Sequence, residues 1–121
     1  MTANRLSNSH SPPSLGRQQS IYGRLSDSRA SVENSVSLNN DLGLAIWSNN
    51  SDHVHYERPG HHTLSCYLNG GYQTQRMFSG KQFGGGAPGK FCLMPSSHRS
   101  EWLINGPLRF VHLYFSEHHL Q

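Results

Sequence analysis

Residues 62–71 read HTLSCYLNGG, and residues 108–116 read LRFVHLYFS. Short apolar or alternating runs of this kind, bounded by turn residues, are typical of β-strands with one buried face. The first run ends in Asn69, Gly70 and Gly71, and these residue types accept the positive φ of a tight hairpin turn. The two runs therefore predict antiparallel β-structure.

Similar runs recur from residue 41 onward at the roughly 8–12-residue spacing of sandwiches and barrels. Turn residues at 79–81 and 105–107 and the glycine-rich loop 84–89 separate them. A phosphate-binding role for that loop is disfavoured, because no Lys-Ser/Thr and no helix follow it. The pattern predicts an all-β protein with strands near 42–48, 52–57, 62–69, 71–78, 81–84, 90–94, 99–104 and 108–116.

Residues 1–40 differ in composition from the rest and hold ten of the eighteen Ser. A segment with so few periodic apolar residues buries too little surface to offset its ordering entropy. We therefore expect a partly disordered N-terminal arm over 1–40, mobile in its first 20 or so residues. Residues 21–38 are expected to pack as a short strand or turn. A helix is predicted to begin at Ser116, which is a suitable N-cap residue.

Composition excludes several protein classes. Hydrophobic residues are 34% and charged residues 14% of the chain, too few for a coiled coil or helical bundle. The formal charge is +3, and no Lys/Arg cluster follows the pattern of a nucleic-acid contact. No apolar run reaches membrane-spanning length, and no signal peptide is recognisable. Cys66 and Cys92 are expected to be free, buried thiols, which predicts a reducing, cytoplasmic location.

A resemblance to a known family rests on three motifs. They are His62–Ser65, the pair Pro88-Gly89 followed after five residues by Pro95, and the aromatic run Phe110–Phe115. Together they resemble the N-terminal sensing domain of bacterial AraC/XylS-type transcriptional regulators. The resemblance implies a cupin-like jelly-roll barrel (a double-stranded β-helix) over residues 41–121. It also implies that dimerising helices and a helix-turn-helix DNA-binding domain lie outside this chain, so that DNA is a partner only through them and a homodimer is possible.

The same resemblance implies that a small-molecule effector binds inside the barrel, while neither the effector nor the direction of regulation is specified. Alternate strand residues point inward in a barrel. Aligned on the motifs, one inward face carries Thr63 and Ser65, and another carries Tyr114. In the arabinose-sensing member, sugar contacts match Asn69, Trp102, Phe110 and His112. The expected ligand-binding residues are Tyr67, Asn69, Ser100, Trp102, Phe110 and His112.

The opposite faces of these strands are expected to form ordinary core between two sheets. Their members are Leu64, Cys66, Leu68, Phe91, Leu93, Val111, Leu113 and Phe115.

Metal and catalytic chemistry find little support in the sequence. The positions that match a metal-binding cupin's ligands hold Tyr56, Arg58, Thr63 and Ser100, and the position of a glycine in its second motif holds Ser97. The run from residue 53 to 57 has His and Glu in the wrong register. No nucleophile–base pattern or carboxylate pair is present, so we expect no metal, no cofactor and no enzyme activity. Two alternatives stay open: a small metal-dependent cupin enzyme, such as an isomerase or dioxygenase, and a barrel that only dimerises.

Overall fold

The structure, a computed structural model, describes residues 20–39, 42–57, 59–78 and 81–116. The predicted mobility of the first 19 residues and the predicted helix after Ser116 lie outside these ranges. The described elements are α1 (Ile21–Ser26), β1 (Ser31–Asn39), β2 (Leu42–Tyr56), β3 (His62–Gly70), β4 (Thr74–Phe78), β5 (Lys81–Phe83), β6 (Phe91–Met94) and β7 (Ser100–Phe115). The expectation of an antiparallel all-β fold is confirmed.

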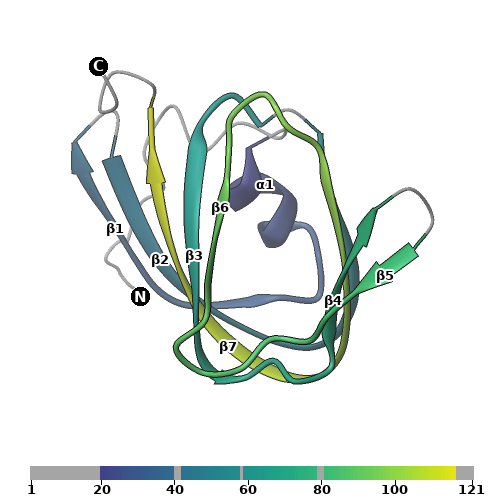
Figure 1. The fold of residues 1–121 in the computed structure, drawn as a ribbon. Coiled ribbons are helices and arrows are strands. Elements are labelled where there is room, and N and C mark those ends of the chain that lie inside the picture. Colours follow the sequence, from purple (N-terminus) through teal and green to yellow (C-terminus); the bar gives the residue numbers. More distant parts are fainter. Residues whose placement is uncertain (1–19, 40–41, 58, 79–80, 117–121) are drawn as a thin grey trace.

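Two long strands, β2 and β7, pair antiparallel along almost their whole length and organise the barrel (Figure 1). The register of this ladder shifts between Asn49 and Ser51, near its middle. A bulge of this kind bends the strand and increases its twist. The β2–β7 pair is shared by two halves of the barrel. At one end, the pair belongs to a five-strand half with the order β1-β2-β7-β3-β6. At the other end, β7 also pairs with β4, which pairs with β5, and these strands form a four-strand half.

The predicted breaks within these two strands are wrong. The expected strands 42–48 and 52–57 form the single strand β2, and 99–104 and 108–116 form β7. Gly106 and Pro107, expected to make a turn, form the bulge in β7, where these two residues face the single residue Asn50 of β2. Pro lacks a backbone N–H, so a bulge tolerates it where a regular ladder does not.

The predicted turn after β3 is confirmed, but the predicted hairpin between β3 and β4 is wrong. Gly70 and Gly71 have φ of 68° and 90°, the left-handed conformation for which glycine is suited. However, β3 pairs with β6 and β7, whereas β4 pairs with β5 and β7. The glycines therefore carry the chain from one half of the barrel to the other, because no ladder joins β3 to β4.

The segment before residue 40 contributes to the fold. Residues 31–39 form β1, as the expectation of a strand or turn allowed, and residues 21–26 form a helix that was not predicted. The Ser20 hydroxyl caps this helix by accepting from the Gly23 N–H at 3.0 Å. Ile21 and Leu25 lie one turn apart and are fully buried, and Figure 1 shows α1 within the outline of the barrel.

The inward-facing side chains form one core. Its large apolar members are Ile21, Leu25, Trp47, Val54, Tyr56, Met94, Ile104, Leu108, Phe110 and Tyr114. Thr63 and Ser65 also point inward and are buried, as the alternation predicted.

The predicted core on the other side of these strands is wrong. Phe91 is 73% exposed and Leu93 51% exposed, because their side chains face outward from the five-strand half. Cys66 and Cys92 are free thiols but only half-buried. No described helix is long and apolar enough to cross a membrane.

Candidate functional site

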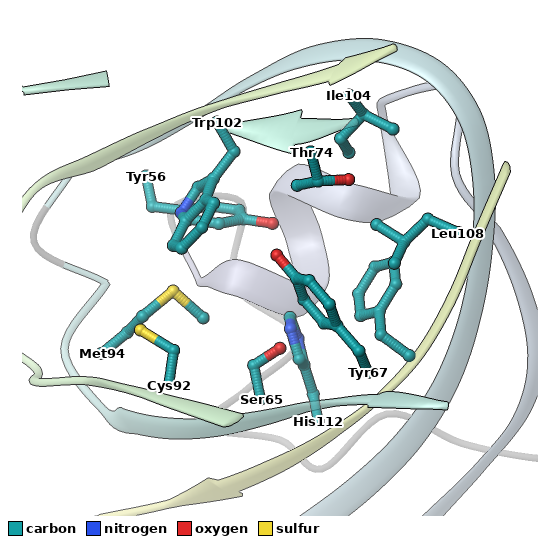
Figure 2. Close-up of a pocket in the computed structure, with 11 residues that line it drawn as sticks. Tyr56, Ser65, Tyr67, Thr74, Cys92, Met94, Trp102, Ile104, Leu108 and His112 are labelled. Carbon is teal, nitrogen blue, oxygen red and sulfur yellow. The ribbon is translucent and has the colours of Figure 1, made fainter. Parts of the chain in front are cut away.

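A cavity of about 40 Å³ lies inside the barrel, between its two halves (Figure 2). A cavity of roughly 10–15 Å³ holds one water molecule, so this cavity has room for about three. Tyr67 and Trp102, two of its lining residues, are only partly buried. Its lining consists of Tyr56, Ser65, Tyr67, Thr74, Cys92, Met94, Trp102, Ile104, Leu108, Phe110 and His112.

Four of the six predicted ligand-binding residues line this cavity: Tyr67, Trp102, Phe110 and His112. Ser100 is buried beside it, and its hydroxyl accepts from the Trp102 indole N–H at 3.2 Å. Ser100 thereby positions one wall of the cavity without lining it.

Asn69 does not reach the cavity. The register of β3 against β7 shifts between Tyr67 and Asn69, so the strict alternation that placed Asn69 inward ends there. Its side chain is exposed, and Oδ1 accepts from the Arg109 guanidinium at 3.5 Å. The placement expected for Asn69 is therefore wrong.

A buried hydrogen-bond chain sets the orientation of His112. The Trp47 indole N–H donates to the Tyr114 hydroxyl oxygen at 2.9 Å, and that oxygen lies 3.0 Å from Nδ1 of His112. The single hydroxyl hydrogen of Tyr114 then has Nδ1 as its acceptor, which satisfies all three groups. This assignment places the imidazole proton on Nε2, leaving Nε2–H as the ring's remaining donor.

The His112 ring is neutral at physiological pH. Burial, reinforced by nearby His61, lowers the pKa of His112 to about 3. The cavity lining contains no Lys, Arg, Asp or Glu. Burial also raises the pKa of Tyr67 to about 12, so its hydroxyl stays protonated. The described lining residues therefore offer hydrogen bonds without a charge.

Hydroxyl groups supply the other polar contacts. Thr74 is 4% exposed, and its Oγ1 has no hydrogen-bond partner within the part of the chain that the structure describes. Figure 2 shows the hydroxyls of Tyr56 and Tyr67 directed toward the space between the lining side chains. A buried hydroxyl without a partner is costly, so a ligand or water that pairs with Thr74 gains free energy.

Sequence reasoning missed several lining residues. Cys92 pairs with Ser65 across β3 and β6, so strand alternation would have placed it inward once that pairing was known. Ile104, Leu108 and Met94 lie two residues from Trp102, Phe110 and Cys92, so the same alternation would have placed them inward. Tyr56 and Thr74 lie in strands whose inward face no motif fixed.

The cavity does not fit a catalytic metal. Its lining has one imidazole and no carboxylate, whereas metals in such sites take several His, Asp or Glu ligands. His53 and His55 both contact the Glu101 carboxylate, and this cluster lies on the outer face of the four-strand half. Across the described ranges, no three His, Cys, Asp or Glu side chains are placed to hold a metal ion.

Comparison with known proteins identifies the fold. No protein-family model matches the sequence, and no curated protein matches it. Among solved structures, the cupin domain of Cnp3 from Schizosaccharomyces pombe superposes with a TM-score of 0.61 at 8% identity, covering 75% of this chain and 63% of that one. A cupin superfamily protein from Desulfitobacterium hafniense gives 0.59 at 12% identity, with coverage of 72% and 77%.

A third match is the EutQ protein of Salmonella typhimurium, with a TM-score of 0.52 at 11% identity. The alignment covers 62% of this chain and 58% of that one, so the chain spans a little over half of that protein's length. These likenesses show that the chain has the cupin fold, which confirms the fold expected from the sequence.

Proposed function

We propose that this chain is a non-enzymatic sensor module whose barrel cavity binds a small, uncharged molecule. The observation that carries the proposal is the neutral His112, held by Tyr114 so that Nε2–H remains as a donor in an uncharged cavity. The Thr74 hydroxyl, which has no partner among the described residues, adds a second polar group from β4 in the four-strand half.

The chemistry of the cavity defines the ligand class. The described lining residues give an anion no cation to pair with and a cation no carboxylate. The Arg76 guanidinium lies outside this lining, over the Trp102 ring at 5.4 Å from the ring centroid. A neutral amide, ketone or alcohol with an apolar body matches the aromatic and aliphatic walls. Its oxygen would accept from His112 Nε2–H, while Tyr67 and Trp102 adjust to its size.

More specifically, we propose that the chain is the effector-binding domain of an AraC-type transcriptional regulator in the cytoplasm. The support is the resemblance of the motifs at 62–65, 88–95 and 110–115, together with the cupin fold. Effector binding would act by population shift, limited by the difference in affinity between two states. DNA would be contacted through a separate helix-turn-helix domain.

A thermal-shift panel of amide and carboxylate pairs tests the proposal. The pairs are acetamide and acetate, isobutyramide and isobutyrate, and benzamide and benzoate. We expect at least one amide to stabilise the protein, by about 2.7 kcal/mol at 100 times its dissociation constant. Its carboxylate should have no effect at the same concentration.

Two variants locate the binding. His112→Ala should weaken the binding of that amide by about 1–3 kcal/mol, since a buried hydrogen bond is lost. His53→Ala, on the outer face, should leave the affinity unchanged. Equal stabilisation by amides and carboxylates, or a requirement for His53 and not His112, would refute the proposal. Stoichiometric iron or manganese in tag-free protein would favour the metal-dependent enzyme instead.

A further inference from the structure

The cavity lining includes the thiol of Cys92, which the proposed function does not use. Cys92 on β6 is the direct partner of Ser65 on β3, and Ser65 is the direct partner of His112 on β7. All three side chains line the cavity, and Figure 2 shows them along one side of the space. A thiol, a hydroxyl and an imidazole therefore form one row across three neighbouring strands.

Hydrogen-bonding groups surround the space that this thiol faces. One donor is His112 Nε2–H, since the other ring nitrogen lies 3.0 Å from the Tyr114 hydroxyl oxygen. A second is the Tyr67 hydroxyl, because burial, with a smaller effect of nearby Cys92, raises the pKa of Tyr67 to about 12. Thr74 is 4% exposed, and its hydroxyl has no partner among the described residues. A buried hydroxyl without a partner points to a polar ligand in the space beside Cys92.

The second cysteine of the chain lies in a matched setting on the opposite side of the sheet. Cys66, like Cys92, is a free and half-buried thiol. The Cys66 sulfur lies 3.8 Å from the carbonyl oxygen of Tyr67. The Cys92 sulfur lies 3.7 Å from the carbonyl oxygen of Leu93. Cys66 follows the inward-facing Ser65 on β3 and does not line the cavity, so the two thiols differ chiefly in what they face.

We propose that Cys92 captures a small, neutral α,β-unsaturated carbonyl compound covalently. The inference rests on the proposed function, because the cavity first binds the neutral molecule, and it narrows the ligand class to electrophiles. The thiol loses its proton to solvent, and its sulfur forms a bond to the β-carbon of the ligand as the carbon–carbon π bond breaks. The α-carbon then takes up a proton from solvent. The net step adds S–H across the double bond and needs no oxidant or reductant.

The position of His112 matches the movement of charge in this step. Negative charge passes from the sulfur to the carbonyl oxygen of the ligand, where a preorganised donor stabilises the transition state. The backbones of Cys92 and His112 are two strand spacings apart, about 9.6 Å. Both side chains point into the cavity, so a short conjugated carbonyl group can lie between them. Room for about three water molecules suits a ligand of a few heavy atoms, such as acrylamide.

The test measures the rate at which acrylamide alkylates each cysteine of the full 121-residue protein, by peptide mass spectrometry. Cys92 should react at least about tenfold faster than Cys66, because only Cys92 has a donor placed for the carbonyl oxygen. The Cys92 rate should saturate as the acrylamide concentration rises. Propionamide, the saturated analogue of similar size, should slow the reaction of Cys92 and leave Cys66 unaffected.

Two variants test the roles of the side chains. His112→Ala should slow the alkylation of Cys92 by about tenfold and leave Cys66 unchanged, as expected for the loss of one buried hydrogen bond. Cys66→Ser is the matched control and should leave the Cys92 rate as it is in wild type. The saturation and propionamide measurements use wild type, so they do not depend on the folding of a variant.

Equal rates for the two cysteines, or a Cys92 rate that rises in strict proportion to acrylamide, would overturn the inference. So would the absence of protection by propionamide, because Cys92 would then react as an ordinary accessible thiol. The thermal-shift panel contains only unreactive amides, so it decides the proposed function separately. Stabilisation by one of those amides together with slow alkylation of Cys92 would refute covalent capture and leave the proposed function standing.

Discussion

His112 combines three properties. It is 2% exposed, it is neutral, and its ring is fixed through Tyr114 by a second buried donor, Trp47. Burial of an imidazole without a counter-charge disfavours the protonated form. His112 therefore acts as a fixed hydrogen-bond donor, and its buried position also links the stability of the fold to pH.

We predict that acid destabilises the protein through His112. In the unfolded chain this ring takes up a proton near pH 6.5, whereas in the folded state its pKa is lowered to about 3, chiefly by burial. Between these values the unfolded state binds more protons, so stability is lost as the pH falls. The contribution approaches about 1.4 kcal/mol per pH unit.

Urea denaturation of wild type and His112→Gln at pH 7, 6, 5 and 4 checks this prediction. The unfolding free energy of wild type should fall more steeply below pH 6.5 than that of the variant, which cannot be protonated at position 112. Parallel curves for the two proteins would show that His112 is not buried in its neutral form.

At the scale of elements, the glycine-rich loop between β5 and β6 supports one wall of the cavity. Gly89 N–H donates to the Tyr67 carbonyl at 2.8 Å, and Tyr67 N–H donates to the Lys90 carbonyl at 2.9 Å. A Cβ on Gly86 would lie 1.5 Å from Cε2 of Tyr67, whereas a Cβ on Gly84 meets nothing within 4 Å. The loop needs glycine at 86 because the Tyr67 ring lies against its backbone.

We therefore predict that Gly86→Ala costs about 1–3 kcal/mol of stability by overpacking against Tyr67. In a Tyr67→Ala background the same substitution should cost much less, because the three nearest atoms all belong to that ring. Chemical denaturation of the four proteins in this double-mutant cycle gives the coupling. A cost for Gly86→Ala that is independent of Tyr67 would contradict the packing described.

The limits of sequence reasoning follow from the same elements. Alternation placed Thr63, Ser65 and Tyr67 inward correctly, because β3 is regular up to Tyr67. It failed at Asn69, where a register shift follows, and no local signal marks that shift. The helix α1 was missed because Ile21 and Leu25 provide only one pair at helical spacing.

The outer face shows a second limit. Alternation grouped Leu64, Cys66 and Val111 correctly on one side of their strands, but a shared side does not reveal what covers it. Apolar residues on that side suggested a core between sheets, and the structure places them outside. Only the barrel topology, with β2 and β7 shared by both halves, determines which side is the interior.

At the scale of the whole molecule, β3 and β7 present different residues on their two sides. Ser65 and His112 face the cavity, while the neighbouring Cys66 and Val111 face outward. The central claim is that the cavity around His112 and Trp102 binds a neutral molecule.

The most direct test of that claim is Trp102 fluorescence during titration with the amide that gives the largest thermal shift. Trp102 lines the cavity, whereas Trp47 lies outside its lining and donates to Tyr114. The emission should change saturably in wild type and in Trp47→Phe, and should not respond to the matching carboxylate. A signal that persists in Trp102→Phe, or no saturable change in Trp47→Phe, would contradict binding in this cavity.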